Sequence, residues 1–179
     1  MSSRAIVYRP AWDDRWSKPS IEELLDAVPE HHQTSIHQLV EGLDGFEELQ
    51  RGISWYGEAW KWTVEYTIGS SDGGESQTVC YVVPNVTTPV VCVPLDAIVL
   101  EKLPIRRLAR VIREGIRSAK CAVTIYWAIW HPTTKVEAEG LTDLVKRKIK
   151  LFKELNNGNG SGNGSTKRKT KATGAAGGK

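Results

Sequence analysis

Hydrophobic residues recur at helical spacing near the N-terminus of the chain. Residues 20–28 and 30–43 each place their apolar side chains on one side of a helix. Ser20 is the first residue of the first segment, and Glu23 stands three residues later, which is the sequence pattern of a capping box. The pattern therefore predicts two consecutive N-terminal helices.

The centre of the chain changes to the two-residue period of a β-strand. From Trp60 to Ile68, apolar and polar residues alternate, which places Trp60 and Trp62 on the same face of a strand. Residues 77–83 and 90–95 are rich in β-branched residues and are bounded by prolines. We expect these segments to be strands of one sheet.

The C-terminal half returns to helices around a further strand. Pro104 begins a predicted helix, residues 121–130 have the composition of one strand, and a final helix runs to Leu155. The expected fold class is α+β. It has a mostly antiparallel sheet of about four or five strands, packed against two N-terminal and two C-terminal helices.

Composition sets the expected boundaries of the domain. We expect residues 1–17 to form an extended arm and residues 18–155 to form a single α+β domain. Residues 156–179 hold no Leu, Ile, Val or aromatic residue, so they bury too little apolar surface to offset the entropy of ordering. The sequence therefore predicts a disordered, basic tail rich in Gly, Asn and Lys.

The net charge of +3 conceals a division along the chain. Residues 1–103 carry 7 basic and 16 acidic side chains, whereas residues 104–155 carry 12 basic and 5 acidic ones. The tail adds 5 basic side chains. Either the folded domain is dipolar, or the two halves interleave on its surface and screen one another.

The cysteines and the N-terminus indicate a cellular compartment. Cys80, Cys92 and Cys121 lie in apolar, β-branched surroundings without Cys-x-x-Cys spacing, so buried reduced thiols are expected. The sequence has no signal-peptide pattern and no run of about 18 apolar residues. We therefore expect a cytoplasmic protein with no membrane contact.

The most distinctive segment is residues 54–62, in which four aromatic residues flank Gly57. One interpretation is a buried core, because large aromatic side chains anchor small domains. The other is the wall of a ligand pocket, with Trp127, Trp130 and His131 able to supply a facing wall. The candidate ligand-binding residues are Trp55, Tyr56, Glu58, Trp60, Trp62, Trp130 and His131.

Four arginines follow helical spacing after Pro104: Arg106, Arg110, Arg113 and Arg117. On one helix they would form a cationic stripe, which favours contact with a polyanion such as nucleic acid. A solvated cationic face is the alternative interpretation.

Metal ligands and catalytic motifs are sparse. His37 and Glu41 lie four residues apart on a predicted helix, but two ligands are fewer than a transition-metal site needs. The sequence contains no Gly-x-Ser-x-Gly, P-loop or His-Glu-x-x-His motif and identifies no cofactor. This favours a non-enzymatic role over a catalytic site assembled in space around His131 and Glu58.

Several segments together resemble the YdhG-like superfamily over residues 18–153. These are Pro-Ser-Ile-Glu-Glu-Leu-Leu at residues 19–25, a second amphipathic helix, Trp-Tyr-Gly-x-x-Trp-Lys-Trp, and a strand ending in Val-Val-Pro before helix, strand and helix. The resemblance implies an α+β sandwich related to frataxin-like iron chaperones. The residues that match an iron role would be Glu22, Glu23, Asp26 and Glu30.

These features lead to two hypotheses. The first is a non-enzymatic binding domain that holds a small molecule or a metal ion. The alternative is a nucleic-acid-associated protein that uses the arginine stripe and the cationic tail.

Overall fold

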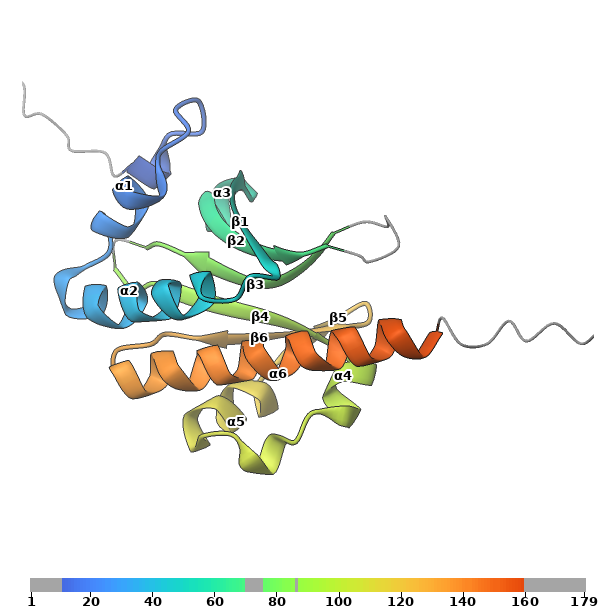
Figure 1. Ribbon diagram of the computed structural model, residues 1–179. Coiled ribbons are helices and arrows are strands. Elements are labelled where there is room, and N and C mark those ends of the chain that lie inside the picture. Colours follow the sequence, from blue (N-terminus) through green and yellow to red (C-terminus); the bar gives the residue numbers. More distant parts are fainter. Residues whose placement is uncertain (1–10, 70–75, 86, 160–179) are drawn as a thin grey trace, which may run out of the picture.

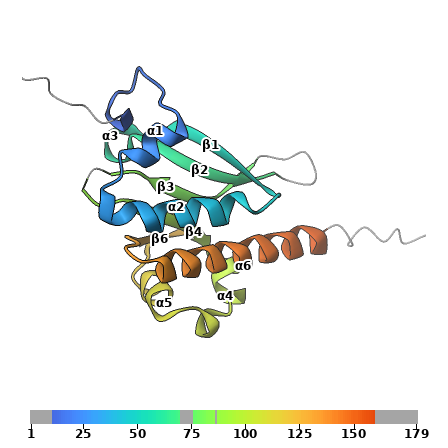
Figure 2. The same cartoon turned by 60° about the vertical axis from the view of Figure 1, so that its left-hand side comes forward.

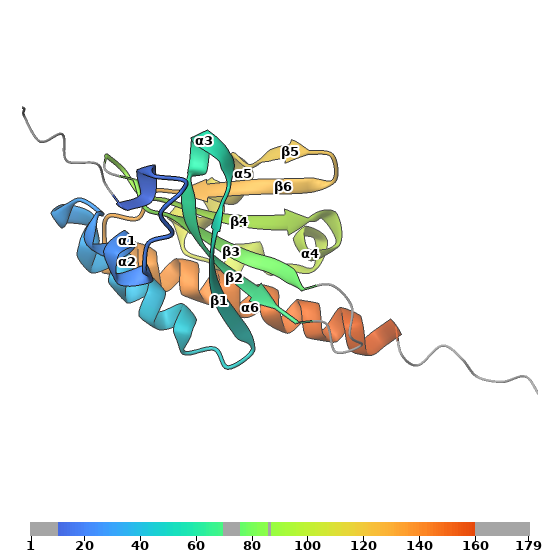
Figure 3. The same ribbon diagram turned by 90° about the horizontal axis from the view of Figure 1, so that it is seen from above.

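The computed structural model describes residues 11–69, 76–85 and 87–159. Within them, six strands form one antiparallel sheet in the order β1-β2-β3-β4-β6-β5 (Figure 3). The strands are β1 (Leu49–Trp55), β2 (Trp62–Ile68), β3 (Gln77–Val83), β4 (Val90–Asp96), β5 (Lys120–Ala122) and β6 (Ile125–Trp130). The α+β class is confirmed, with more strands than the four or five expected. Residues 1–10 and 160–179, where much of the predicted arm and tail falls, lie outside the described residues.

Helices lie against one face of the sheet. In Figures 1 and 2, α2 (Glu30–Asp44) and α6 (Lys135–Asn159) run side by side, preceded by α1 (Ile21–Asp26). The short helices α4 (Ala97–Lys102) and α5 (Arg110–Arg117) lie on the other side of α6. A one-turn helix, α3 (Gly57–Trp60), connects β1 to β2. The predicted capping box is present at the start of α1, where Ser20 and Glu23 bond reciprocally.

The main core fills the space between the sheet and the helices. A buried row crosses four neighbouring strands on this face: Val64, Val82, Val91 and Trp130. Leu39 of α2 and Leu144 of α6 belong to the same buried cluster. The two helices approach closely at Gly42, where an added Cβ would lie 2.9 Å from Thr142 Oγ1.

The described part of the N-terminal arm contains a 3₁₀ turn, η1 (Ala11–Asp13). This turn places Trp12 in the core, whereas Trp16 is 88% exposed. Lys61 pairs with Asp13, and its Nζ lies 4.6 Å from the centroid of the Trp12 ring. The segment is therefore attached to the connection between β1 and β2.

The strand predicted to begin at Trp60 begins at Trp62. Trp60 ends α3, and Lys61 has a φ of 49°, which interrupts the alternation of faces. Trp60 packs on Tyr81 at one face of the sheet, whereas Trp62 packs on Trp55 at the helix-covered face. The prediction that Trp60 and Trp62 share a face is wrong.

The helix predicted to begin at Pro104 is divided. Residues Ile105–Arg107 form a 3₁₀ turn, η2, and the backbone at Leu108 and Ala109 is extended before α5 begins. Arg106 therefore lies in η2, apart from Arg110, Arg113 and Arg117 in α5. The predicted stripe of four arginines on one helix is wrong.

The strand predicted over residues 121–130 is a hairpin. Val123 and Thr124 join β5 to β6, and Val123 has a φ of 60°. A positive φ is what a two-residue hairpin loop requires at its first position. Cys121 on β5 is exposed, so the expectation of three buried thiols holds for Cys80 and Cys92 alone.

A buried lysine holds β3 and β4 where their ladder ends. Lys148 of α6 is almost fully buried. Its Nζ donates to the carbonyl oxygens of Thr78, Val79 and Pro94 at 3.4, 3.1 and 2.5 Å. The ammonium group therefore satisfies three backbone carbonyl groups just beyond the end of the β3–β4 ladder.

Candidate ligand-binding surface

The face of the sheet opposite the helices carries a second row of neighbours across the same four strands: Glu65, Tyr81, Cys92 and Ile129. In the described part of the chain, α3 is the one helix that folds over this side, at its β1–β2 end. In Figure 3, α2 and α6 lie beneath the strands. We call this side the uncovered face.

Four aromatic rings gather on the uncovered face, and we call them the aromatic cluster: Tyr56, Trp60, Tyr81 and Trp127. Tyr81 lies at the centre, with ring centroids 5.2 Å from Tyr56, 5.3 Å from Trp60 and 6.1 Å from Trp127. The pairs with Tyr56 and Trp60 are edge-to-face, a geometry that aromatic quadrupoles favour.

The rings of the cluster are exposed to different degrees. Tyr81 is 8% exposed, Tyr56 is 37% exposed, and Trp60 and Trp127 are half-buried. Tyr81 is thus the floor of the cluster, and the other three rings present partly open surfaces. Cys92 faces the same side between β3 and β6 but has no exposed surface, because Tyr81 and Trp127 stack above its strand.

The connection from β1 to β2 places Tyr56 and Trp60 over the sheet. Gly57 has a φ of 75°, and the amide of Tyr56 donates to the carbonyl of Lys61 at 2.9 Å. The amide of Lys61 donates in turn to the carbonyl of Gly57 at 2.7 Å. These bonds close a tight turn whose two aromatic residues reach Tyr81.

Glu65 borders the aromatic cluster. Ser54 Oγ donates to its Oε1 at 2.5 Å, and the Tyr56 hydroxyl donates to its Oε2. Gly52 lies opposite Glu65 on β1 and leaves room for its side chain, since an added Cβ would lie 3.4 Å from Glu65 Cγ. Burial, and then the bond to Glu65, raise the pKa of Tyr56 well above its usual range, so its phenol remains a donor.

The structure separates the seven candidate ligand-binding residues. Tyr56 and Trp60 join the aromatic cluster. Trp55 and Trp62 form an edge-to-face pair at 5.7 Å on the helix-covered face, where Trp62 Nε1 donates to the carbonyl of Asp14. Trp130 is buried on that face too and donates to the carbonyl of Val111 at 3.2 Å.

The remaining two candidates are exposed. Glu58 lies in the first turn of α3, next to the aromatic cluster in sequence. His131 follows β6, with Nδ1 3.1 Å from the carbonyl oxygen of Pro89. The sequence suggested that Trp127, Trp130 and His131 could form a facing wall. Of these three residues, Trp127 alone reaches the cluster. Tyr81 and Glu65 were not among the predicted residues.

The arginines lie on the other side of the molecule. Arg110 of α5 donates through Nε to Glu114 at 2.7 Å. α5 packs on the helix-covered face, because Gly115 lies directly against the indole of Trp130 and a Cβ there would overlap it. The arginines of α5 and the aromatic cluster therefore do not share a surface.

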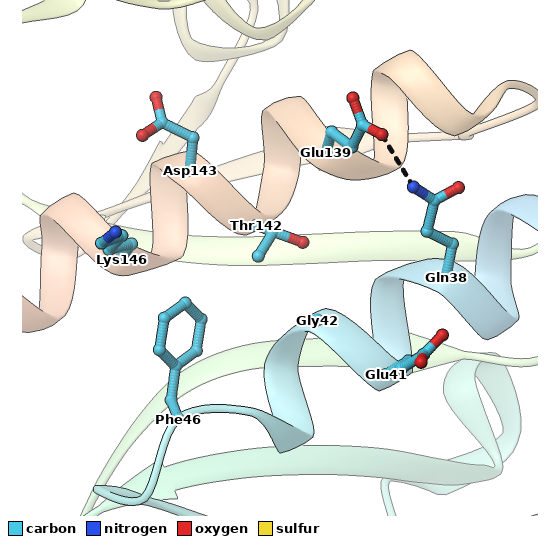
Figure 4. Close-up of a pocket in the computed structure, with 8 residues that line it drawn as sticks. All are labelled: Gln38, Glu41, Gly42, Phe46, Glu139, Thr142, Asp143 and Lys146. Carbon is cyan, nitrogen blue, oxygen red and sulfur yellow. Dashed lines mark hydrogen bonds between the residues drawn. The ribbon is translucent and has the colours of Figure 1, made fainter.

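A groove between α2 and α6 has a volume of about 570 Å³ (Figure 4). Glu41, Glu139, Asp143 and Lys146 line it, together with the Gly42–Thr142 contact. Gln38 Nε2 donates to Glu139 Oε1 at 2.9 Å, while Gln38 Oε1 is buried without a partner. The groove is open and mixes both charges, so its lining selects no ligand class.

The described residues contain no group of three or more side chains placed to hold a metal ion. Of the acidic residues matched to an iron role, Glu23 is used in the capping box. None of the described helices combines the length and apolar character needed to span a bilayer.

Comparisons with protein-family models, with curated proteins and with solved structures gave no match. The resemblance to the YdhG-like superfamily therefore stays a prediction.

Proposed function

We propose that the chain is a binding domain that holds a small molecule with a flat apolar group on its uncovered face. The observation that supports this is the aromatic cluster. Trp60 and Trp127 remain half-buried on a sheet face that no long helix covers within the described residues. Small-molecule sites are lined mainly by apolar and aromatic side chains, with a few placed polar groups that orient the ligand.

The cluster is held in place before any ligand arrives. Tyr81 packs against three rings, and the turn around Gly57 is closed by two backbone hydrogen bonds. A surface that is already ordered loses little conformational entropy on binding. Stacking on Trp60 or Trp127 then contributes about 1–3 kcal/mol per aromatic group, the range measured for bases on aromatic side chains.

The nucleic-acid alternative receives less support from the geometry. A single-stranded nucleic acid needs aromatic rings and basic groups along one groove. Here α5 lies on the helix-covered face, whereas the aromatic cluster lies on the other and is bordered by Glu65. The alternative stays a prediction that a salt-dependent titration with RNA and DNA would test.

Calorimetric titration with three compounds that share an indole ring tests the proposal: indole, tryptamine and indole-3-acetate. We expect at least one to bind with a 1:1 stoichiometry. Trp60→Ala should then weaken binding at least about tenfold, because it removes a stacking partner. Trp16→Ala is the matched control, since Trp16 is exposed outside the cluster, and it should leave the affinity unchanged. Binding that survives Trp60→Ala and Trp127→Ala would contradict the proposal.

A further inference from the structure

We infer that the ligand of the aromatic cluster is a small organic cation, with an ammonium group held against the open rings and Glu65 as its counter-charge. This inference rests on the proposed function and adds the chemical class of the ligand. It follows from the position of one carboxylate relative to the rings and to the basic side chains of the same region.

Glu65 is half-buried and lies directly opposite Tyr81, the floor of the cluster, in the ladder between β2 and β3. Each of its carboxylate oxygens accepts one hydrogen bond, from Ser54 and from Tyr56. An ionised carboxylate has about four lone-pair sites. The carboxylate is therefore fixed in position and retains acceptor capacity towards a ligand.

No neighbouring base among the described residues neutralises Glu65 with an ion pair. Lys61, which adjoins Trp60 in sequence, is turned towards Asp13 and the Trp12 ring. Lys120 is on β5, opposite Trp127. Three strands lie between β2, which carries Glu65, and β5, which carries Lys120. Glu65 and Lys120 are therefore about 19 Å apart across the sheet. This separation exceeds the Debye length of about 8 Å at physiological salt.

The rings and the Glu65 carboxylate both favour a positive charge on the ligand. The face of an aromatic ring carries negative potential and attracts a cation within about 6 Å of its centroid. Glu65 adds a full negative charge at the edge of the same cluster, and Glu58 lies exposed on α3. An anion would meet electrostatic repulsion from both groups, and a neutral ligand, although it can stack on the rings, would gain no charge attraction from them.

The test uses choline and its uncharged isostere 3,3-dimethylbutan-1-ol, titrated into the full-length protein by NMR. The two compounds have the same shape, so the difference in affinity reports the charge. We expect choline to bind at least about tenfold more tightly. Glu65→Gln keeps the shape of the side chain and one of its two acceptor oxygens, while the amide NH2 can donate to the other hydroxyl. The variant should remove most of this preference while leaving the isostere unaffected. Glu22→Gln, an exposed carboxylate on α1, is the control and should change neither affinity.

The outcomes separate the two proposals. If choline and the isostere bind equally well and Trp60→Ala abolishes the binding of both, the inference that the ligand is a cation is overturned. The proposal that the aromatic cluster binds a ligand is then still supported. If Glu65→Gln still prefers choline, Glu65 is not the counter-charge of the ligand, and the inference is overturned. If neither choline nor the isostere binds but indole binds at Trp60, the inference that the ligand is a cation is again overturned and the proposed function is not. Failure of both compounds and of the whole indole series would overturn both proposals.

Discussion

The ammonium group of Lys148 joins the carbonyl groups of Val79 and Pro94 just beyond the end of the ladder between β3 and β4. The ladder between β3 and β4 pairs Tyr81 with Cys92, and the same register continued by two residues sets Val79 opposite Pro94. Proline has no N–H to give to the Val79 carbonyl. Lys148 Nζ donates to that carbonyl at 3.1 Å and to the Pro94 carbonyl at 2.5 Å.

The first prediction concerns this buried donor. Lys148→Met keeps the apolar stem but leaves the carbonyl groups of Thr78, Val79 and Pro94 without their donor. We expect the free energy of unfolding to fall by about 1–3 kcal/mol, measured by urea denaturation. Lys146→Met, two residues away and exposed, should change it by less than about 0.5 kcal/mol. A Lys148→Met protein as stable as the wild type would contradict this account.

The second prediction concerns the pH dependence of stability. Burial lowers the pKa of Lys148 to about 8 from its ordinary 10.5. Between these values the unfolded chain holds a proton that the folded chain has released, so the contribution of Lys148 to stability increases as pH rises from 8 to 10.5. Burial also raises the pKa of Cys80 and Cys92 to about 12, and these thiols act in the opposite direction above pH 9.

Comparison with Lys148→Met isolates the lysine, because both proteins keep the two cysteines. The wild type should gain about 2–3 kcal/mol relative to the variant between about pH 7.5 and 10. Urea denaturation at a series of pH values measures this difference. A difference that stays constant or shrinks with rising pH would show that the lysine is not held in a low-dielectric site.

The third prediction concerns the hairpin between β5 and β6. Val123 has a φ of 60°, a conformation that is strained for a β-branched residue. Val123→Gly removes this strain, and because Val123 is almost fully exposed no packing is lost. We expect thermal unfolding to show a gain of about 1 kcal/mol. The same change at exposed Val136 in α6 should instead destabilise by about 0.3–0.5 kcal/mol, and a loss at Val123 would count against the described turn.

The fourth prediction concerns the thiols. Cys121 is exposed, whereas Cys80 and Cys92 are buried. A thiol-reactive dye should therefore label one cysteine rapidly in the native protein and three in denaturant. Trp127→Ala should make Cys92 reactive as well, because Trp127 and Tyr81 stack above its strand, while Trp16→Ala should not. One labelled thiol in native Trp127→Ala would show that the cluster does not cover Cys92.

Some elements of the fold follow from local patterns in the sequence. The capping box at Ser20 and the alternation from Trp62 to Ile68 are properties of neighbouring residues, and both are present in the structure. The face of Trp60 did not follow, because it depends on the positive φ of Lys61. That conformation accompanies contacts of Lys61 with Asp13 and Trp12, which are distant in sequence.

The candidate site was harder to predict than the fold. Tyr81 lies in a strand whose residues from Val79 to Val83 are all buried, so no alternation of polarity assigns its face. The role of Glu65 depends on Gly52 and Ser54 across the ladder with β1. The turn at Gly57 sets the register between β1 and β2, which brings Gly52 and Ser54 next to Glu65. This register cannot be predicted from the spacing of residues along one strand.

The central claim is that the uncovered face binds a ligand at the aromatic cluster. Tryptamine titration of the full-length protein labelled with 5-fluorotryptophan tests it most directly, with the seven tryptophan resonances assigned by Trp→Phe variants. The account predicts that the ¹⁹F resonances of Trp60 and Trp127 shift together along one saturating curve, while those of Trp16 and Trp130 stay in place. Saturable shifts elsewhere with Trp60 and Trp127 unmoved, or no shift at all, would contradict it.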